Sequence, residues 1–383
     1  MGPLKGIRVI EMAGIGPGPF AGMLLADLGA EVIRIDRSKA GMTTNGGPVD
    51  VMNRGKKSIS VDLKNPAGVE VVLKLIETAD ALIEGYRPGV MEKLGLGPDV
   101  CIARNKRLVF GRMTGWGQTG PLAHTAGHDI NYIAITGALD SIGTKESGPV
   151  VPLNLLGDFG GGSMYLIMGL LAGIIEAKNS GKGQAIDVAI TDGVISLMSF
   201  MHGFKAMGMW ESGRNINMLD GTAHYYDTYQ CSDGEWISIG SIEPQFYALL
   251  EEKLGVDLQS SDFMVQYDKT RWPELKEQVK QVILAKPSDY WCELMEGTDV
   301  CFAPVLSLQD SPEYPHNKQR QSYVEIEGVT QSAPAPRFSR TVSEIGNVAV
   351  VNGANTDEIL ASLGLDEAAI AKLNETGAVK CAE

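Results

Sequence analysis

The chain has 383 residues, a net charge of −14, 44% hydrophobic residues and 21% charged residues. This composition is typical of a globular α/β protein with two domains, and its acidity argues against a nucleic-acid partner. We find no apolar run of about 18 residues and no secretory leader pattern, so we expect no membrane contact and a cytoplasmic location. The five scattered cysteines have neither disulfide nor metal spacing, which predicts no metal site.

Alternating apolar strands and helices predict a doubly wound parallel sheet in the first third of the chain. Asn65 and Pro66 have the residue types of a helix N-cap and of a first helical residue. The expected strands are residues 6–12, 31–36, 58–63, 81–84 and 107–111, and the expected helices are 19–28 and 66–79.

The remaining chain predicts an apolar helix at 160–177, a strand at 183–189 and a long helix at 191–208. A hairpin over 225–229 and 235–240 then opens a smaller α+β domain. Further helices are expected at 245–254, 271–285, 357–363 and 367–376. We therefore expect a large domain over 1–190 that about 330–383 complete, a linker helix over 191–221, a small domain over 222–304 and a return linker over 305–329.

A glycine-rich segment follows the first strand and has the spacing Gly16-x-Gly18-x-x-Ala21, with Asp36 at the end of the second strand. This spacing is that of a dinucleotide-binding loop. However, Pro17 and Pro19 lack the backbone N–H groups that a pyrophosphate requires. We prefer the interpretation of a tight strand-to-helix turn that closes one wall of an active site.

His128 and Asp158 are candidates for an acid/base pair, since an imidazole titrates near neutrality and burial can tune a carboxylate toward it. Such a pair can take a proton from one face of a carbon and return it to the other, as in a racemase or epimerase. From the residues alone, His128 also fits a capping or core histidine, and Asp158 fits a helix N-cap. His124 is expected to be a surface residue.

Six separated motifs stand out along the chain: residues 14–19 (GIGPGP), 61–64 (VDLK), 85–89 (GYRPG), 127–132 (GHDINY), 157–162 (GDFGGG) and 242–247 (IEPQFY). In this order they resemble the family III CoA-transferase superfamily and, within it, the alpha-methylacyl-CoA racemases. The resemblance implies a Rossmann-like large domain with a smaller α+β domain, in an interlocked homodimer.

The resemblance further implies a racemase that interconverts (2R)- and (2S)-2-methylacyl-CoA thioesters by two-base 1,1-proton transfer through an enolate. His128 and Asp158 are then the catalytic bases, and Glu243 partners the histidine across the dimer interface. CoA is part of the substrate, and no separate cofactor is expected.

The resemblance also assigns the CoA contacts, among which cationic side chains suit the phosphates. Where the family commonly has a further arginine, this chain has Lys93, which cannot form a bidentate phosphate contact. The expected CoA-contacting residues are Arg37, Val61, Asp62, Leu63, Lys64, Gly85, Tyr86, Arg87, Lys93, Gly127, His128, Asp129, Ile130, Asn131 and Tyr132.

Charge is distributed unevenly along the chain. Residues 1–120 carry 16 Lys or Arg against 12 Asp or Glu, whereas the rest carry 17 against 35. An anionic ligand is therefore expected to bind the first third of the chain.

Two questions stay open at this level. A CoA-transferase of the same family would use Asp158 as the nucleophile that attacks a thioester, and would not require His128 as a second proton-transfer group. The apolar residues around Met198–Trp210 suit either a core helix or a methionine-rich surface that accepts varied acyl chains.

Overall fold

The computed structural model describes residues 2–37 and 46–380, which form two compact units. The larger unit combines Met1–Thr136, Leu153–Leu197 and Lys318–Glu383, and the smaller unit combines Gly137–Pro152 and Met198–Asn317. The unit boundaries differ from those expected from sequence, and the expected linkers 191–221 and 305–329 are each divided between the two units. Residues 137–152 belong to the smaller unit, and residues 318–329 belong to the larger one. Cys381 lies outside the described residues.

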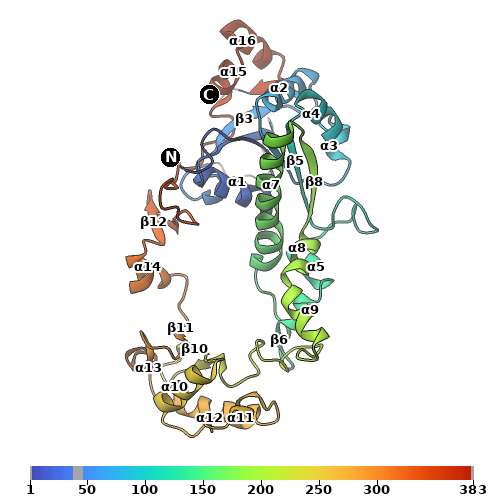
Figure 1. Ribbon diagram of the computed structural model, residues 1–383. Helices are drawn as coiled ribbons and strands as arrows, with labels where there is room; N and C mark the ends of the chain where they lie inside the picture. Colours follow the sequence, from blue (N-terminus) through green and yellow to red (C-terminus); the bar gives the residue numbers. More distant parts are fainter. Residues whose placement is uncertain (1, 38–45, 381–383) are drawn as a thin grey trace. The chain divides into compact units, whose positions relative to one another are not determined.

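The core of the larger unit is a seven-stranded sheet with the strand order β14-β3-β2-β1-β4-β5-β8 (Figure 1). Every neighbouring pair is parallel except β14 with β3. The predicted doubly wound parallel sheet is therefore confirmed. The strands are β1 (Arg8–Met12), β2 (Glu31–Arg37), β3 (Lys57–Val61), β4 (Ala81–Glu84), β5 (Val109–Thr114), β8 (Gln184–Ala189) and β14 (Val379–Lys380).

Helices connect these strands and cover the sheet. Asn65 caps helix α2 as predicted, because its side-chain oxygen accepts the N–H of Ala67 at 3.0 Å and Pro66 is the first helical residue. The helices are α1 (Pro17–Asp27), η1 (Val51–Asn53), α2 (Pro66–Glu77), α3 (Val90–Lys93), α4 (Pro98–Arg104), α5 (Asp129–Ala134), η2 (Leu155–Ser163), α7 (Met164–Ser180), α8 (Ile190–Leu197), α15 (Thr356–Ser362) and α16 (Glu367–Glu375).

The apolar segment after Asn154 is a π-helix, η2, that continues directly into α7, which runs beside β5 and β8 (Figure 1). Small residues allow close packing here, since a Cβ on Gly173 would lie 2.7 Å from a methyl of Val109. Together, Leu155–Ser180 is long and apolar enough to cross a membrane by length and composition, contrary to the sequence-based expectation. A core helix of a soluble protein passes the same test, so this is weak evidence for a membrane span.

The long helix expected over 191–208 is broken at Met198. This residue follows the last residue of α8, Leu197, and is the N-cap residue of α9 (Ser199–Ala206). Helix α9 has no buried residues, and Phe200 and Met207 are 52% and 63% exposed. The interpretation of this segment as a core helix is therefore wrong for the chain as described.

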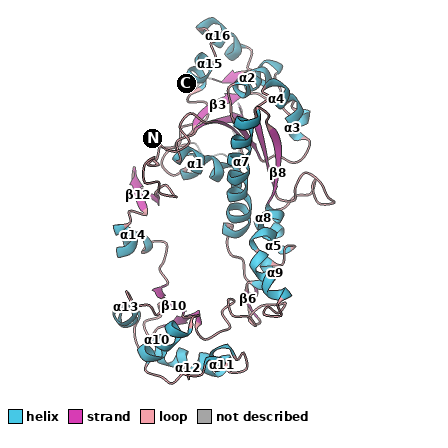
Figure 2. Ribbon diagram, in the orientation of Figure 1, coloured by secondary structure: helices cyan, strands magenta, loops and turns pink. Residues whose placement is uncertain are grey.

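The smaller unit contains the predicted hairpin, β9 (Tyr226–Gln230) with β10 (Trp236–Gly240), and a third strand, β11 (Phe302–Pro304), that we did not predict. Helices surround this short sheet (Figure 2), and Tyr225, Tyr247 and Trp272 are among its largest buried side chains. The other elements are α6 (Ala138–Ser141), β6 (Gly143–Thr144), β7 (Gly148–Pro149), α10 (Pro244–Leu254), α11 (Phe263–Tyr267), α12 (Trp272–Leu284), α13 (Ser288–Met295) and η3 (Ser311–Glu313).

The return segment, expected to be an irregular linker, contains regular structure. Helix α14 (Pro315–Gln319) is followed by an antiparallel hairpin of β12 (Tyr323–Ile326) and β13 (Val329–Ser332). The side chain of Gln331 accepts a hydrogen bond from Arg54 at 2.8 Å, so within the larger unit the hairpin is fixed to the end of η1.

Candidate active site

The glycine-rich turn between β1 and α1 lies against Asp158. Gly16 has φ 69°, a conformation that favours glycine, and a Cβ at this position would lie 3.2 Å from Asp158 Oδ2. Ser163, at the end of the π-helix, donates from its hydroxyl to the carbonyl of Pro17 at 2.8 Å. These contacts confirm the tight strand-to-helix turn and place it beside Asp158; its role as a wall of the active site stays a prediction.

His128 is the N-cap residue of α5, and its backbone is fixed on both sides. Its N–H donates to the side-chain oxygen of Asn131 at 3.0 Å, and its carbonyl accepts the N–H groups of Asn131 and Tyr132. The side chain is exposed.

Asp158 lies on the π-helix and is held through its backbone by Asp129. The buried carboxylate of Asp129 accepts the N–H of Asp158 at 2.7 Å. Burial raises the pKa of Asp158, the negative charge of Asp129 raises it further, and the hydrogen bond from Asn154 and the proximity of His128 oppose the rise. His128 and Asp158 are linked through the structure, because Asp129, which accepts the N–H of Asp158, directly follows His128 in the chain. A carboxylate with a raised pKa suits proton transfer near neutral pH.

A cavity of about 210 Å³ brings together part of the predicted site. Of the expected CoA-contacting residues, Gly85, Tyr86, Arg87, Gly127, His128 and Tyr132 line it. Pro88, Thr114, Gly115, Trp116, Ala123, Thr125 and Ala126 complete the lining. Two motifs separated by about forty residues in the sequence therefore share one cavity.

The remaining predicted CoA contacts lie outside the lining of this cavity. Arg37, at the end of β2, has its guanidinium carbon 5.8 Å from the ring centre of Tyr86, so it lies beside the cavity wall. Lys64 is exposed just beyond β3, and Lys93 is exposed at the end of α3. Asp129 is buried, and Ile130 and Asn131 are exposed on α5. Val61 is buried within the sheet, whereas Asp62 and Leu63 are half-buried beyond its end.

Glu243 belongs to the smaller unit, where it is the exposed N-cap residue of α10. Its charge acts on two neighbours. After burial, which is the larger cause, Glu243 raises the pKa of the Cys301 thiol and of the Tyr267 hydroxyl. Glu243 therefore lies near the end of β10 and the start of β11.

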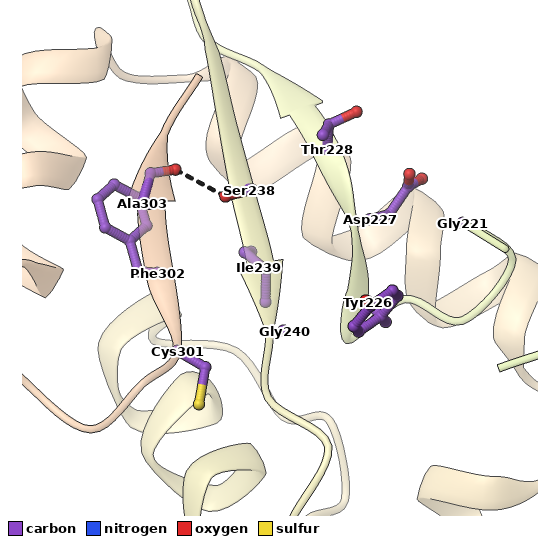
Figure 3. A pocket seen from close by; sticks show the side chains of 10 residues that line it. All are labelled: Gly221, Tyr226, Asp227, Thr228, Ser238, Ile239, Gly240, Cys301, Phe302 and Ala303. Carbon is purple, nitrogen blue, oxygen red and sulfur yellow. Dashed lines mark hydrogen bonds between the residues drawn. The ribbon is translucent and has the colours of Figure 1, made fainter. Parts of the chain in front are cut away.

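The smaller unit has a cavity of its own, of about 540 Å³, on the three-stranded sheet (Figure 3). Tyr226 and Asp227 on β9, Ile239 on β10, and Cys301 and Phe302 at β11 contribute side chains to it. Ser238 donates to the carbonyl of Ala303 at 2.9 Å, which fixes β10 to β11. None of the residues predicted to be catalytic or to contact CoA lines this cavity.

Sequence reasoning missed two features of the site. Trp116 lines the cavity of the larger unit and meets Tyr132 edge to face, with ring centres 4.8 Å apart. The hydroxyl of Tyr132 in turn donates to the carbonyl of Gly127. Asp129, expected only as a CoA contact, also anchors Asp158. The glycine at 157 is a signal for this anchor, because a Cβ there would overlap the Asp129 carboxylate.

Comparisons with known proteins place this arrangement in context. The profile of CoA-transferase family III matches residues 4–354. Alpha-methylacyl-CoA racemase from Mus musculus is 41% identical over 97% of this chain and 96% of its own length, and the Homo sapiens enzyme is 40% identical with the same coverage. Succinyl-CoA:glutarate CoA-transferase from Mus musculus is 30% identical over 99% of the chain and 91% of its own length. Among solved structures, a CAIB/BAIF family protein from Brucella suis aligns with a TM-score of 0.79 and 26% identity, covering 94% of this chain and 99% of that one.

Proposed function

The chain belongs to CoA-transferase family III, and from that premise we propose that it is an acyl-CoA racemase that interconverts (2R)- and (2S)-2-methylacyl-CoA thioesters. The observation that carries the proposal is that His128 lines a cavity together with two CoA-type motifs, while Asp129, the next residue in the chain, holds the backbone of Asp158. The similarity to two racemases at about 40% identity over nearly the whole chain supports the same activity.

In the proposed mechanism, the 2-carbon of the thioester lies between His128 and Asp158. One base removes the α-proton, and the electron pair of the broken C–H bond moves to the thioester oxygen to give an enolate. The conjugate acid of the other base then protonates the opposite face of the carbon. Burial raises the pKa of Asp158, which makes its carboxylate a stronger base for this exchange.

Backbone N–H groups at the start of α5 are suited to stabilise the enolate oxygen. The first bonds of this helix are donated by Asn131 and Tyr132 to the carbonyl of His128. The N–H groups of Asp129 and Ile130 precede them and have no carbonyl within the helix to bond. In this proposal they donate to the developing oxyanion.

We further propose that the active form is a homodimer, in which Glu243 of a second copy orients the imidazole of His128. The family resemblance supports this assignment, as does the exposure of the His128 side chain. Glu243→Gln is expected to lower kcat with little change in thermal stability, because the side chain is exposed. Sedimentation of the wild-type protein as a monomer at assay concentration would contradict the dimer.

The decisive experiment incubates the protein with a single-enantiomer 2-methylacyl-CoA in heavy water and follows deuterium incorporation and chirality together. His128→Ala and Asp158→Ala should each abolish inversion. His124→Ala is the matched control, since this exposed histidine lies outside the motif and should leave the rate unchanged. Undiminished α-hydrogen exchange in both site variants would refute the two-base mechanism.

A second candidate function is CoA transfer between carboxylic acids. The 30% identity to a succinyl-CoA:glutarate CoA-transferase favours it, and Asp158 would then be the nucleophile. Mass spectrometry of the protein with acyl-CoA alone separates the two functions. A covalent acyl or CoA adduct on Asp158 supports transfer, whereas deuterium uptake without an adduct supports racemisation.

A further inference from the structure

Glu84 and Arg112 form a cross-strand ion pair at the carboxyl ends of β4 and β5. The two residues are directly opposite in the parallel register, and Arg112 Nε donates to Glu84 Oε1 at 2.9 Å. Glu84 is fully buried, and the Arg112 side chain is only 10% exposed. A buried ion pair is generally a poor source of stability, because desolvation offsets the attraction between the charges. Its position at the edge of the cavity points to another role.

Arg112 also holds helix α3. Its two terminal nitrogens donate to the two carboxylate oxygens of Glu92, at 2.8 and 3.2 Å. This planar, bidentate geometry fixes both the distance and the orientation of the helix. Gly97 packs closely on the other side, since a Cβ there would lie 2.9 Å from Glu92 Cγ. The final residue of α3 is Lys93, one of the cations expected at the CoA phosphates.

Glu84 holds the loop that lines the cavity. Its second carboxylate oxygen accepts the N–H of Tyr86 at 2.7 Å, so both oxygens of this buried side chain have partners. The loop places Tyr86 and Arg87 in the cavity wall, and the Tyr86 ring is in turn covered by Arg37. The buried Arg112 is therefore linked through Glu84 to the loop that carries Arg87. Through Glu92 it is linked to the helix that carries Lys93.

We propose that Glu84, Arg112 and Glu92 form an ionic bracket whose role is to position the loop Gly85–Pro88 and helix α3 for the nucleotide part of CoA. The inference rests on the proposed function, because it takes an acyl-CoA as the ligand. All three are positioning residues. Arg112 is not assigned as a phosphate ligand, because its charge is already balanced by the two carboxylates that it bonds. Arg37, Arg87 and Lys93 meet the phosphates, and the bracket holds the segments of the latter two in place.

The test compares Glu84→Gln and Glu92→Gln with the wild-type protein, using CoA binding by calorimetry and deuterium exchange on two thioesters. One substrate is a 2-methylacyl-CoA, and the other is the same acyl group on pantetheine, which lacks the nucleotide. Each variant should raise the Kd for CoA and the KM for the CoA ester roughly tenfold, the factor expected when a displaced cation loses one charged hydrogen bond to a phosphate. The kcat for the CoA ester and the kinetics on the pantetheine ester should stay unchanged.

Asp27→Asn is the matched control, because Asp27 and Arg54 form an equally buried, doubly bonded ion pair away from the loop. It removes the same charge and should lower the melting temperature without changing CoA affinity. Should Glu84→Gln fold poorly, Glu92→Gln still tests the proposal, since the Glu92 side chain is 44% exposed.

The bracket is overturned if CoA affinity in the glutamine variants matches the wild type or shifts no more than in the control. It is also overturned if the pantetheine ester is affected as strongly as the CoA ester. Failure of the wild-type protein to exchange deuterium would instead refute the racemase proposal, while CoA calorimetry would still report on the bracket.

Discussion

Replacing Asp129 by asparagine perturbs the direct link between the two candidate bases, because Asp129 follows His128 in the chain and accepts the N–H of Asp158 at 2.7 Å. A hydrogen bond to a charged acceptor contributes about 1.5–3 kcal/mol and a neutral one about 0.5–1.5 kcal/mol. The Asp129→Asn variant would keep the bond, but the bond would contribute roughly 1 kcal/mol less to holding Asp158 in place. This corresponds to about a fivefold change in the equilibrium between the bonded and unbonded states. Asp129→Ala would leave the N–H unpaired and the π-helix less constrained, for which we expect a roughly hundredfold loss of kcat.

The charge of Asp129 also raises the pKa of Asp158, so its removal must lower that pKa. In the pH profile of kcat for deuterium exchange, the limb that belongs to Asp158 should therefore move to lower pH in Asp129→Asn. Asp99→Asn, an exposed first-turn aspartate on α4, is the control and should leave the profile unchanged. An unmoved limb in Asp129→Asn, or a shift to higher pH, would refute the electrostatic coupling of the two carboxylates.

Three further predictions concern other parts of the chain. Gly157→Ala should abolish deuterium exchange while leaving CoA calorimetry unchanged, because a Cβ there overlaps the Asp129 carboxylate; an active variant would contradict the anchoring role. Burial lowers the pKa of His224 to about 3, so the unfolded chain binds a proton below about pH 6.5 that the folded smaller unit does not. Stability should then fall as the pH drops from about 6.5 toward 3, by roughly 3 kcal/mol at pH 4.5, and His224→Gln should flatten this dependence in thermal denaturation; equal slopes would exclude His224 as its source. Lys93→Arg should tighten CoA binding in calorimetry, since a guanidinium bonds phosphate bidentately, and unchanged affinity would place Lys93 away from the phosphates.

The sequence predicts the parallel sheet well because its inner strands, β1 to β5, are largely buried and rich in apolar residues. It does not predict β14, since two residues are too short for a periodic signal and the strand is defined only by pairing with Val61 and Ser60. The break at Met198 is missed for a related reason, as no glycine or proline marks it.

Within the site, local motifs identify His128 and Asp158, but they do not reveal what holds them. The bond from Asp158 to Asp129 and the bracket around Arg112 join residues about twenty to thirty positions apart, and only the fold brings these partners together. Glu243 is assigned from the family resemblance alone, because nothing in its local sequence distinguishes it from a solvated loop carboxylate.

The pairing of β14 with β3 has a consequence for biogenesis. Translation proceeds at about 5–20 residues per second, so the outer edge of β3 stays open for roughly tens of seconds until the last strand emerges from the ribosome. An open strand edge invites aggregation, which charged side chains such as Lys57 counteract. Most of the smaller unit comes from the continuous segment Met198–Asn317, which can complete its own core before that edge closes. A nascent chain arrested just before Ala378 should therefore combine a protease-resistant smaller unit with a chaperone-bound sheet.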